Sequence, residues 1–387
     1  MKKIFFATAV LGTMGTAHAQ SSVTLYGVAD ANIEYVSHLG SQPPTSANGF
    51  NAGQGGNTWR LTSGGLSSSR WGLRGVEDLG SGTKAVYVLE SGFSIDNGVQ
   101  SQGRLFGRQA YVGLDSRYGQ FLFGRQYTSL FHIMANYSPT AYAVQYEPVV
   151  AFAGANLRED NTAKYIGTFG PVTAIAHWSF GTGVALPGTS QGAPSVGGNG
   201  EVPGQFRRDS AYGLGAEYAA GPFGVAVAYD QYNPSLSSAA GAFVGTGSFK
   251  KATIGASYTL GATAKIMGGY RWGQNKAQDG STLILRDDFF WVGGNYQVTP
   301  ALGLTLEYNY DNVKNLLGQT HLANPWQVSF IADYTLSKRT DLYLTTAFLK
   351  NAGLNFDTSA ISFANGYFLA SGQSTMLGVA LGVRHKF

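Results

Sequence analysis

Apolar and polar residues alternate along most of this chain, in short segments separated by turns. The alternation is clearest in the last segment, where alternate positions hold Leu377, Val379, Leu381, Val383, His385 and Phe387. The positions between them hold Gly378, Ala380, Gly382, Arg384 and Lys386. Because successive side chains of a β-strand point to opposite faces, this pattern predicts a strand with one apolar face and one face of small or basic residues.

Sixteen segments of this kind predict sixteen β-strands. They span residues 22–36, 58–77, 83–94, 104–115, 119–127, 161–169, 172–181, 208–218, 223–232, 249–259, 262–273, 284–297, 301–313, 324–336, 340–350 and 375–387. Long connections rich in Gly, Ser, Asn and Pro, which are typical of solvent-exposed loops, alternate with short turns. An even number of strands, with long loops at one end and short turns at the other, is typical of an antiparallel barrel in an outer membrane.

Tyrosines recur in the second half of the chain. The repeat consists of Tyr218, Tyr258, Tyr296 and Tyr334, spaced by 40, 38 and 38 residues. Each tyrosine precedes a short turn, so one repeat is a hairpin plus a longer loop. Aromatic rings at the same height on successive strands are expected at a membrane interface. A propeller blade has a similar period, but its four short strands do not fit segments of this length.

The stretch from Thr128 to Asp160 interrupts the regular pattern. It contains Pro139 and Pro148, is rich in aromatic and small apolar residues, and follows neither a period of 2 nor one of 3.6. A long irregular insert in a regular β-architecture is usually a functional loop or a linker. Because this one carries enough apolar residues to pack against a wall, we expect residues 128–160 to fold into the barrel and constrict it.

The first nineteen residues have the pattern of a secretory signal peptide. Lys2 and Lys3 precede an apolar run that ends near Met14, and Ala17-His18-Ala19 provides a cleavage site. The run is too short for a transmembrane helix, which needs about 20 apolar residues. We therefore expect residues 1–19 to be removed, and residues 20–387 to form a single barrel domain.

Composition supports an exported membrane barrel. Only 12% of the residues are charged, against about 25% in ordinary soluble domains, and no later window of 18 apolar residues predicts a membrane helix. Without Lys2 and Lys3 the chain has 24 basic and 22 acidic residues, so its charge gives no support for nucleic-acid binding. It contains no cysteine, which excludes a disulfide-stabilised scaffold.

Five stretches resemble the Gram-negative general diffusion porins, and most closely their betaproteobacterial branch. They are Ser22–Asp30 (SVTLYGVAD), Ser69–Gly80 (SRWGLRGVEDLG), Phe106–Leu114 (FGRQAYVGL), Phe123–Tyr127 (FGRQY) and Gly382–Phe387 (GVRHKF). The resemblance runs in order through the whole chain after the signal peptide. It implies a homotrimer of sixteen-stranded barrels, each with its third long loop folded inward. It also implies that the barrel-assembly machinery reads the terminal Phe387.

Arginines occupy the positions expected to face the interior of the barrel. Within residues 58–77, three arginines share one parity, and Trp59, Trp71 and Leu73 share the other. A charge on the lipid face costs about 2–4 kcal/mol near the membrane midplane, so the arginines should face inward. The predicted basic wall consists of Arg60, Arg70, Arg74, Arg104, Arg108, Arg125 and Arg158.

The balance of charge at the constriction predicts the selectivity of the pore. The resemblance implies a cluster of wall arginines opposite acidic loop residues, with Arg70, Arg108 and Arg158 at the cluster positions. Between Thr128 and Leu157 the only carboxylate is Glu147, so we expect a net positive constriction that prefers anions. Two alternatives remain open: carboxylates elsewhere offset the arginines, or some arginines brace the trimer. The candidate carboxylates are Glu34, Glu90, Glu159 and Asp160.

The function that we predict is passive diffusion of small hydrophilic solutes and ions across an outer membrane, in contact with its lipid and lipopolysaccharide. A substrate-specific channel is the main alternative, because Tyr137, Tyr142 and Tyr146 could form an aromatic path in the loop. A barrel enzyme is less favoured, since no nucleophile elbow or P-loop occurs. An adhesin or anchor is less favoured because nothing in it would need to narrow the lumen. The scattered histidines predict no metal site, and nothing predicts a cofactor. His132 could titrate near pH 6–7.

Overall fold

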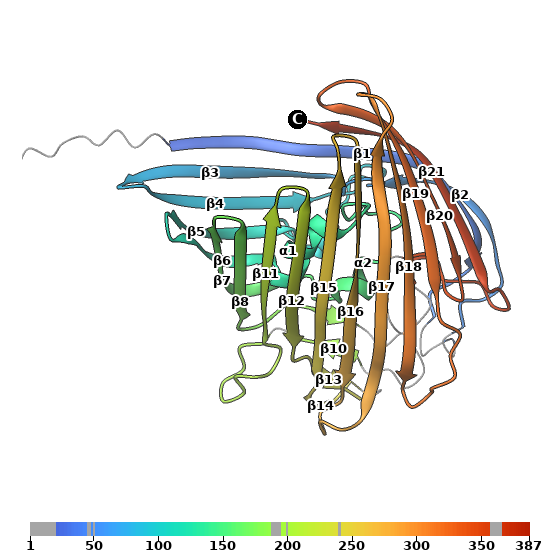
Figure 1. Ribbon diagram of the computed structural model, residues 1–387. Helices are drawn as coiled ribbons and strands as arrows, with labels where there is room; N and C mark the ends of the chain where they lie inside the picture. The colour runs from blue at the N-terminus through green and yellow to red at the C-terminus, as the bar shows by residue number, and fades with distance from the viewer. Residues whose placement is uncertain are drawn as a thin grey trace, which may run out of the picture.

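The computed structural model of the chain is a closed antiparallel β-barrel (Figure 1). It describes residues 21–44, 48, 51–186, 195–198, 200–238, 241–356 and 366–387. The predicted signal peptide lies outside the described residues. Among those that are described, no helix is both long and apolar enough to cross a membrane.

Within the described residues, seventeen strand segments form the wall of the barrel. They are β1 (Ser21–Gly40), β2 (Gly55–Ser63), β3 (Arg70–Gly80), β4 (Thr83–Gly92), β5 (Gln109–Ser116), β6 (Gly119–Tyr127), β7 (Arg158–Phe169), β8 (Val172–Ser179), β11 (Ala211–Ala220), β12 (Phe223–Tyr232), β15 (Ser248–Leu260), β16 (Ala264–Lys276), β17 (Leu283–Gln297), β18 (Leu302–Leu316), β19 (Trp326–Thr335), β20 (Thr340–Lys350) and β21 (Thr375–Lys386). Each pairs with its neighbours in antiparallel register, and β21 closes the barrel on β1, for example through Ile33 opposite Leu381.

Sixteen strands surround the barrel because β2 and β3 are two parts of one strand. The first half of β1 pairs with β3 and its second half pairs with β2, on the same edge. Between them, the backbone N–H groups of Gly65, Leu66 and Ser67 donate to the Asp30 carboxylate at 3.0, 3.0 and 2.8 Å. The predicted number of strands is confirmed, and the predicted strand 58–77 contains a short carboxylate-capped interruption.

Two features differ from the sequence-based expectation. The strand predicted at 104–115 begins only at Gln109, because a short 3-10 turn, η2 (Ser101–Gly103), precedes it. In addition, four short strands pair into a separate sheet at the barrel end that carries the long connections (Figure 1). They are β9 (Ala185–Leu186), β10 (Ser195–Gly197), β13 (Ser235–Ser237) and β14 (Phe243–Thr246). Their short segments in Gly- and Ser-rich loops gave no periodic signal.

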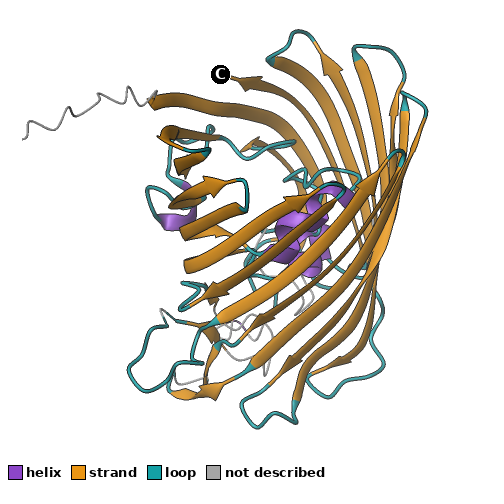
Figure 2. Ribbon diagram, turned by 60° about the vertical axis from the view of Figure 1, so that its left-hand side comes forward, coloured by secondary structure: helices purple, strands orange, loops and turns teal. Residues whose placement is uncertain are grey.

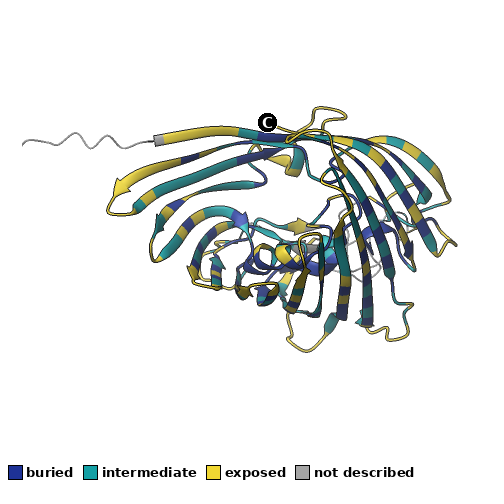
Figure 3. Ribbon diagram, turned by 45° about the horizontal axis from the view of Figure 1, so that its top comes forward, coloured by how far each residue is buried: buried dark blue, intermediate teal, exposed yellow. Residues whose placement is uncertain are grey.

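The alternation of side chains between the two faces follows the prediction. Bands of buried and exposed residues alternate along the strands (Figure 3). The tyrosines of the repeat point outward, with exposed fractions of 45% for Tyr218, 49% for Tyr258, 53% for Tyr296 and 48% for Tyr334. This outward ring of aromatic side chains is what an interfacial girdle requires.

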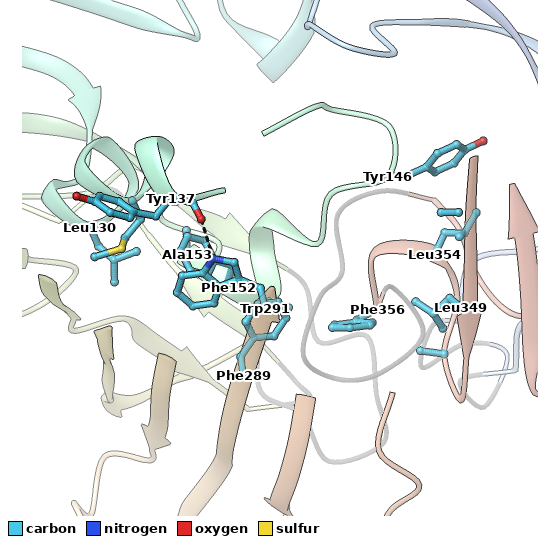
Figure 4. Packing of buried hydrophobic residues seen from close by; sticks show 14 of the residues in the cluster. Leu130, Tyr137, Tyr146, Phe152, Ala153, Phe289, Trp291, Leu349, Leu354 and Phe356 are labelled. Atoms are coloured by element: carbon cyan, nitrogen blue, oxygen red, sulfur yellow. Dashed lines mark hydrogen bonds between the residues drawn. The ribbon is translucent and has the colours of Figure 1, made fainter. Parts of the chain in front are cut away.

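The segment after β6 lies inside the barrel (Figure 2). It contains α1 (Ser129–Met134), η3 (Ala135–Tyr137) and α2 (Val149–Ala153), and the last long connection adds η4 (Leu354–Phe356). Phe152 of α2 packs against Trp291 and Phe289 of the wall, at ring-centroid distances of 4.7 and 6.0 Å (Figure 4). The core of this protein is therefore a contact between an inner loop and the barrel wall.

Candidate pore constriction

The inner loop is attached to the wall first at its N-terminal end. Thr128 caps α1 by accepting a hydrogen bond from the Phe131 N–H at 3.2 Å. The Ser129 hydroxyl lies 2.7 Å from Nδ1 of His177 on β8, and the Leu130 N–H donates to Asp230 on β12 at 3.3 Å. These bonds fix α1 against β8, β11 and β12.

A second attachment joins η3 to β11 and β17. The indole N–H of Trp291 donates to the Tyr137 carbonyl at 2.7 Å (Figure 4), and the Asn295 amide donates to the Pro139 carbonyl at 2.7 Å. The Tyr137 hydroxyl donates to Glu217 at 3.0 Å. A predicted constriction residue, Tyr137, is thus buried and serves to hold the loop.

A third attachment lies on the other side of the barrel. The Tyr146 hydroxyl donates to Glu34 of β1 at 2.9 Å, and Gln327 of β19 donates to the Tyr146 carbonyl at 2.8 Å. The Gln145 amide donates to Asn32 at 3.1 Å. Figure 4 shows Tyr146 well separated from Tyr137, so the loop spans the interior between opposite parts of the wall.

The loop returns to the wall through α2. Arg271 of β16 donates from Nη2 to the Ala151 carbonyl at 2.5 Å, while it forms a buried ion pair with Asp287 of β17. Ala141 and Val144, although inside the barrel, are exposed, Val144 by 41%. Solvent-accessible space therefore remains on one side of the loop, and the loop narrows the barrel without filling it.

On that open side three arginines gather around one carboxylate and one phenol. Glu90 of β4 lies 2.7 Å from Nε of Arg108 and 3.6 Å from Nε of Arg70. The hydroxyl of Tyr127, at the end of β6, accepts hydrogen bonds from Arg108 and Arg158, each at 3.1 Å. The structure thus brings together the three arginines assigned to one cluster from the sequence.

The remaining arginines of the predicted basic wall lie around this cluster. Arg104 and Arg125 share Asp160, with N–O distances of 2.7 and 2.6 Å. Arg60 pairs with Glu34 at 2.5 Å. Arg74 lies over the Tyr26 ring, 5.4 Å from its centroid. Arg104 and Arg108 reach the interior from the segment that precedes β5, so their positions follow from tertiary contacts rather than from strand parity.

The charges of this wall do not cancel. Among the described residues, its seven arginines form ion pairs with three carboxylates, those of Glu34, Glu90 and Asp160. Glu159, another carboxylate considered as an offset, instead lies 3.0 Å from Nε2 of His177. Counted over these seven arginines and three carboxylates, the positive charges exceed the negative ones by four.

The loop carboxylate Glu147 does not face the arginines. It is buried, accepts hydrogen bonds from the hydroxyls of Ser138 at 3.1 Å and of Thr140, and lies beside Glu307 of β18. Burial and the Glu307 carboxyl hold the pKa of Glu147 well above its usual range. Glu147 thus adds little negative charge to the open side.

His132 of α1 is placed near a cation. Lys164 of β7 lies 3.1 Å from its Nδ1. Enclosure by the loop and wall, together with this ammonium, lowers the pKa of His132 to about 4. The imidazole is therefore neutral at pH 6–7, in contrast to the titration considered from the sequence.

Sequence reasoning missed the residues that organise the site. Tyr127 links two arginines but shares the strand parity of Phe121 and Phe123, which face outward. The register shift between Gly124 and Gln126 separates Tyr127 from that pattern, so strand parity alone could not have placed it inside. Asp230, Glu217 and Glu307 hold or adjoin the loop from distant strands, and only their inward parity could have indicated a role. Among the described residues, no cluster of three or more His, Cys, Asp or Glu side chains is arranged to hold a metal ion.

Comparisons with known proteins agree with this geometry. A family profile described as Gram-negative porin matches residues 7–354. An outer membrane porin protein of Bordetella pertussis is 32% identical, and outer membrane porin protein 32 of Delftia acidovorans is 30% identical, with all of both chains covered in each case. An anion-selective porin from Comamonas acidovorans has a similar fold, with a TM-score of 0.73 at 24% identity, over 95% of this chain and 100% of that one.

Proposed function

The chain belongs to the Gram-negative porin family and is a passive channel of the outer membrane, and on this premise we propose that its constriction prefers anions. The prediction of a porin-type diffusion channel is confirmed. The selectivity and the roles of individual residues are the proposal.

The uncompensated charge on the β2–β7 side is the observation that carries this proposal. Arg158 is half-buried and, within the described part of the chain, has no carboxylate within ion-pair distance. Glu147, the only carboxylate of the loop between Thr128 and Leu157, is buried away from the arginines, and burial beside Glu307 raises its pKa. Fixed positive charge at a narrow point raises the local concentration of anions and lowers that of cations.

The zero-current potential in a planar bilayer under a KCl gradient tests the selectivity. We expect a potential that favours chloride, and a chloride-to-potassium permeability ratio that falls about twofold or more in Arg158→Gln and Arg108→Ala, since each removes a charge from the narrowest region. Arg117→Gln is the matched control, because Arg117 lies exposed in the turn between β5 and β6. A cation-favouring potential in the unmodified protein would overturn the proposal.

We also propose that the channel is a homotrimer. Five apolar side chains of β1 and β2, each more than half exposed, offer an outward surface for contact with a second copy or with lipid: Val23, Leu25, Ile33, Trp59 and Leu61. The trimer form of an outer membrane protein of Vibrio cholerae has a similar fold. Light scattering of the detergent-purified protein tests the trimer, and a monomer mass would contradict it.

Three finer assignments belong to the same proposal. The outer aromatic girdle would contact membrane lipid and lipopolysaccharide. Phe387, which exchanges backbone hydrogen bonds with Gly27 at 3.0 and 3.1 Å, would be read by the barrel-assembly machinery. The two relatives of this chain named above are porins, and we infer that the role of the chain is diffusion rather than catalysis.

A further inference from the structure

A stack of aromatic rings runs from the arginine cluster onto the inner loop. The ring of Tyr127 lies 4.7 Å from that of Phe131 at an interplanar angle of 18°. Phe131 lies 4.4 Å from Tyr142 at 22°. The three rings therefore form one near-parallel stack that begins on the wall and ends on the loop.

The stack begins at a guanidinium group. Arg158 lies over the Tyr127 ring, 4.6 Å from its centroid. Phe131 lies at a similar distance from the same ring, so Tyr127 contacts both the guanidinium group and the next ring of the stack. Arg108 and Arg158 both donate to the hydroxyl of the same tyrosine. The cluster thus places guanidinium groups directly beside an aromatic surface.

The arginines of the cluster and the rings of the aromatic stack both border open space. Arg70, Arg158, Tyr127, Phe131 and Tyr142 are all half-buried. The neighbouring loop residues Ala141 and Val144 are exposed inside the barrel. Since the middle ring, Phe131, is stacked between Tyr127 and Tyr142, its edge is the part available to a passing solute.

We propose that the constriction selects aromatic carboxylates over aliphatic anions of the same charge and similar size. A planar guanidinium binds a carboxylate through paired hydrogen bonds. An aromatic ring edge carries positive partial charge and attracts the face of another ring in a T-shaped contact. A solute such as benzoate can satisfy both contacts at once.

A carboxylate with a saturated ring of nearly equal size makes the contact with the guanidinium group but not the contact with the aromatic ring edge. Cyclohexanecarboxylate carries the same charge as benzoate and lacks the π-system. It is therefore the comparison solute, because any difference between the two reflects the ring contact rather than charge or size. This inference rests on the anion preference proposed above and adds the class of solute.

Zero-current potentials under gradients of sodium benzoate and of sodium cyclohexanecarboxylate give the two permeabilities. We expect the benzoate-to-cyclohexanecarboxylate ratio to be about threefold, as a single favourable aromatic contact provides. Phe131→Leu should lower this ratio to about one, whereas Phe131→Tyr should retain it. Phe123→Leu is the control, because Phe123 is 53% exposed on the outward face of β6.

The outcomes separate the two proposals. A ratio near one in the unmodified protein, or one that Phe131→Leu leaves unchanged, overturns the aromatic selectivity. Loss of the ratio in Phe131→Tyr also overturns it, because that variant keeps the ring. The chloride-to-potassium preference, measured in the same bilayers, decides the anion proposal independently, since it does not involve an aromatic solute.

Discussion

At the scale of single residues, Glu90 determines how the arginines are arranged. Its carboxylate is buried, pairs with Arg70 and Arg108, and accepts a hydrogen bond from Tyr26 at 3.1 Å. Like charges brought this close repel, so one carboxylate between two guanidinium groups allows both to stay in the narrow region. Glu90 therefore holds the guanidinium groups of Arg70 and Arg108 in place and also offsets part of their positive charge.

Replacing Glu90 tests its effect on ion preference and its effect on the stability of the barrel. In Glu90→Gln the amide keeps the shape and one acceptor but removes a negative charge, so we expect the chloride preference to rise by about twofold or more. Removing one partner of a buried ion pair typically costs about 3 kcal/mol, so the barrel should also lose stability. Zero-current potentials and the unfolding temperature in detergent measure the two effects. An unchanged or weaker anion preference would show that the cluster does not control selectivity.

At the scale of elements, the inner loop depends on the wall for its structure. Its two helices have six and five residues, and helices this short are not stable alone in water. Hydrogen bonds with β8, β12 and β16 fix the helices instead, and hydrogen bonds from β17 and β19 fix the segment between them. The loop can therefore hold a constriction only while these contacts persist.

The protonation of Glu147 links the loop to pH. Its raised pKa means that the folded loop binds a proton that the detached loop releases above its ordinary pKa of 4.5. Stability contributed by this proton is complete below pH 4.5 and decreases as pH rises towards the raised value, by about 1.4 kcal/mol for each unit of pKa shift. We expect open-channel current noise to increase between pH 5 and pH 8.5 in the wild type and to stay constant in Glu147→Gln.

The matched control for this prediction is Glu201→Gln, since Glu201 is an exposed carboxylate in another long connection. It should keep the wild-type pH dependence. This explanation by the protonation of Glu147 fails if Glu147→Gln remains as pH-sensitive as the wild type, or if it loosens the loop at pH 5.

At the scale of the whole molecule, the barrel is a closed ring with one seam between the ends of the chain. The C-terminus lies beside β1 (Figure 1), and β21 pairs with β1 from Val28 opposite Lys386 to Val36 opposite Gly378. Closure removes the free strand edges that a bilayer does not tolerate. The seam should therefore be sensitive to close packing at Gly27, which pairs with Phe387.

A side chain at Gly27 tests the seam. A Cβ there would lie 2.3 Å from the Phe387 ring and 2.7 Å from the Arg70 carbonyl oxygen, and that backbone atom cannot move aside. Overpacking of this kind costs about 1–3 kcal/mol, so Gly27→Val should lower the temperature at which the folded, fast-migrating band is lost in SDS gels. Gly56→Val on β2 is the control, because a Cβ at Gly56 meets no atom within 4 Å. Equal melting of the two variants would contradict the prediction.

The sequence by itself determined the wall of the barrel. A strand repeats every two residues, so lipid-facing and lumen-facing positions can be read directly from the chain. The reading fails only where the strand is irregular: Arg125 shares the parity of the outward-facing Phe123 but lies beyond the register shift after Gly124 and pairs with Asp160. The sequence also indicated where the regular pattern stops, since the inner loop follows neither the period of a strand nor that of a helix.

Only the tertiary structure decided what meets inside the barrel. Glu90 reaches Arg108 across 18 positions of the chain, and Tyr146 reaches Glu34 across 112. The direction of Glu147 depends on a loop without a repeat, whose conformation is set by distant strands. The small sheet of β9, β10, β13 and β14 likewise forms between separate loops. The period of a strand predicts which face of the barrel a residue occupies. Which side chain it contacts on that face depends on how the barrel closes and on how the inner loop packs against the wall.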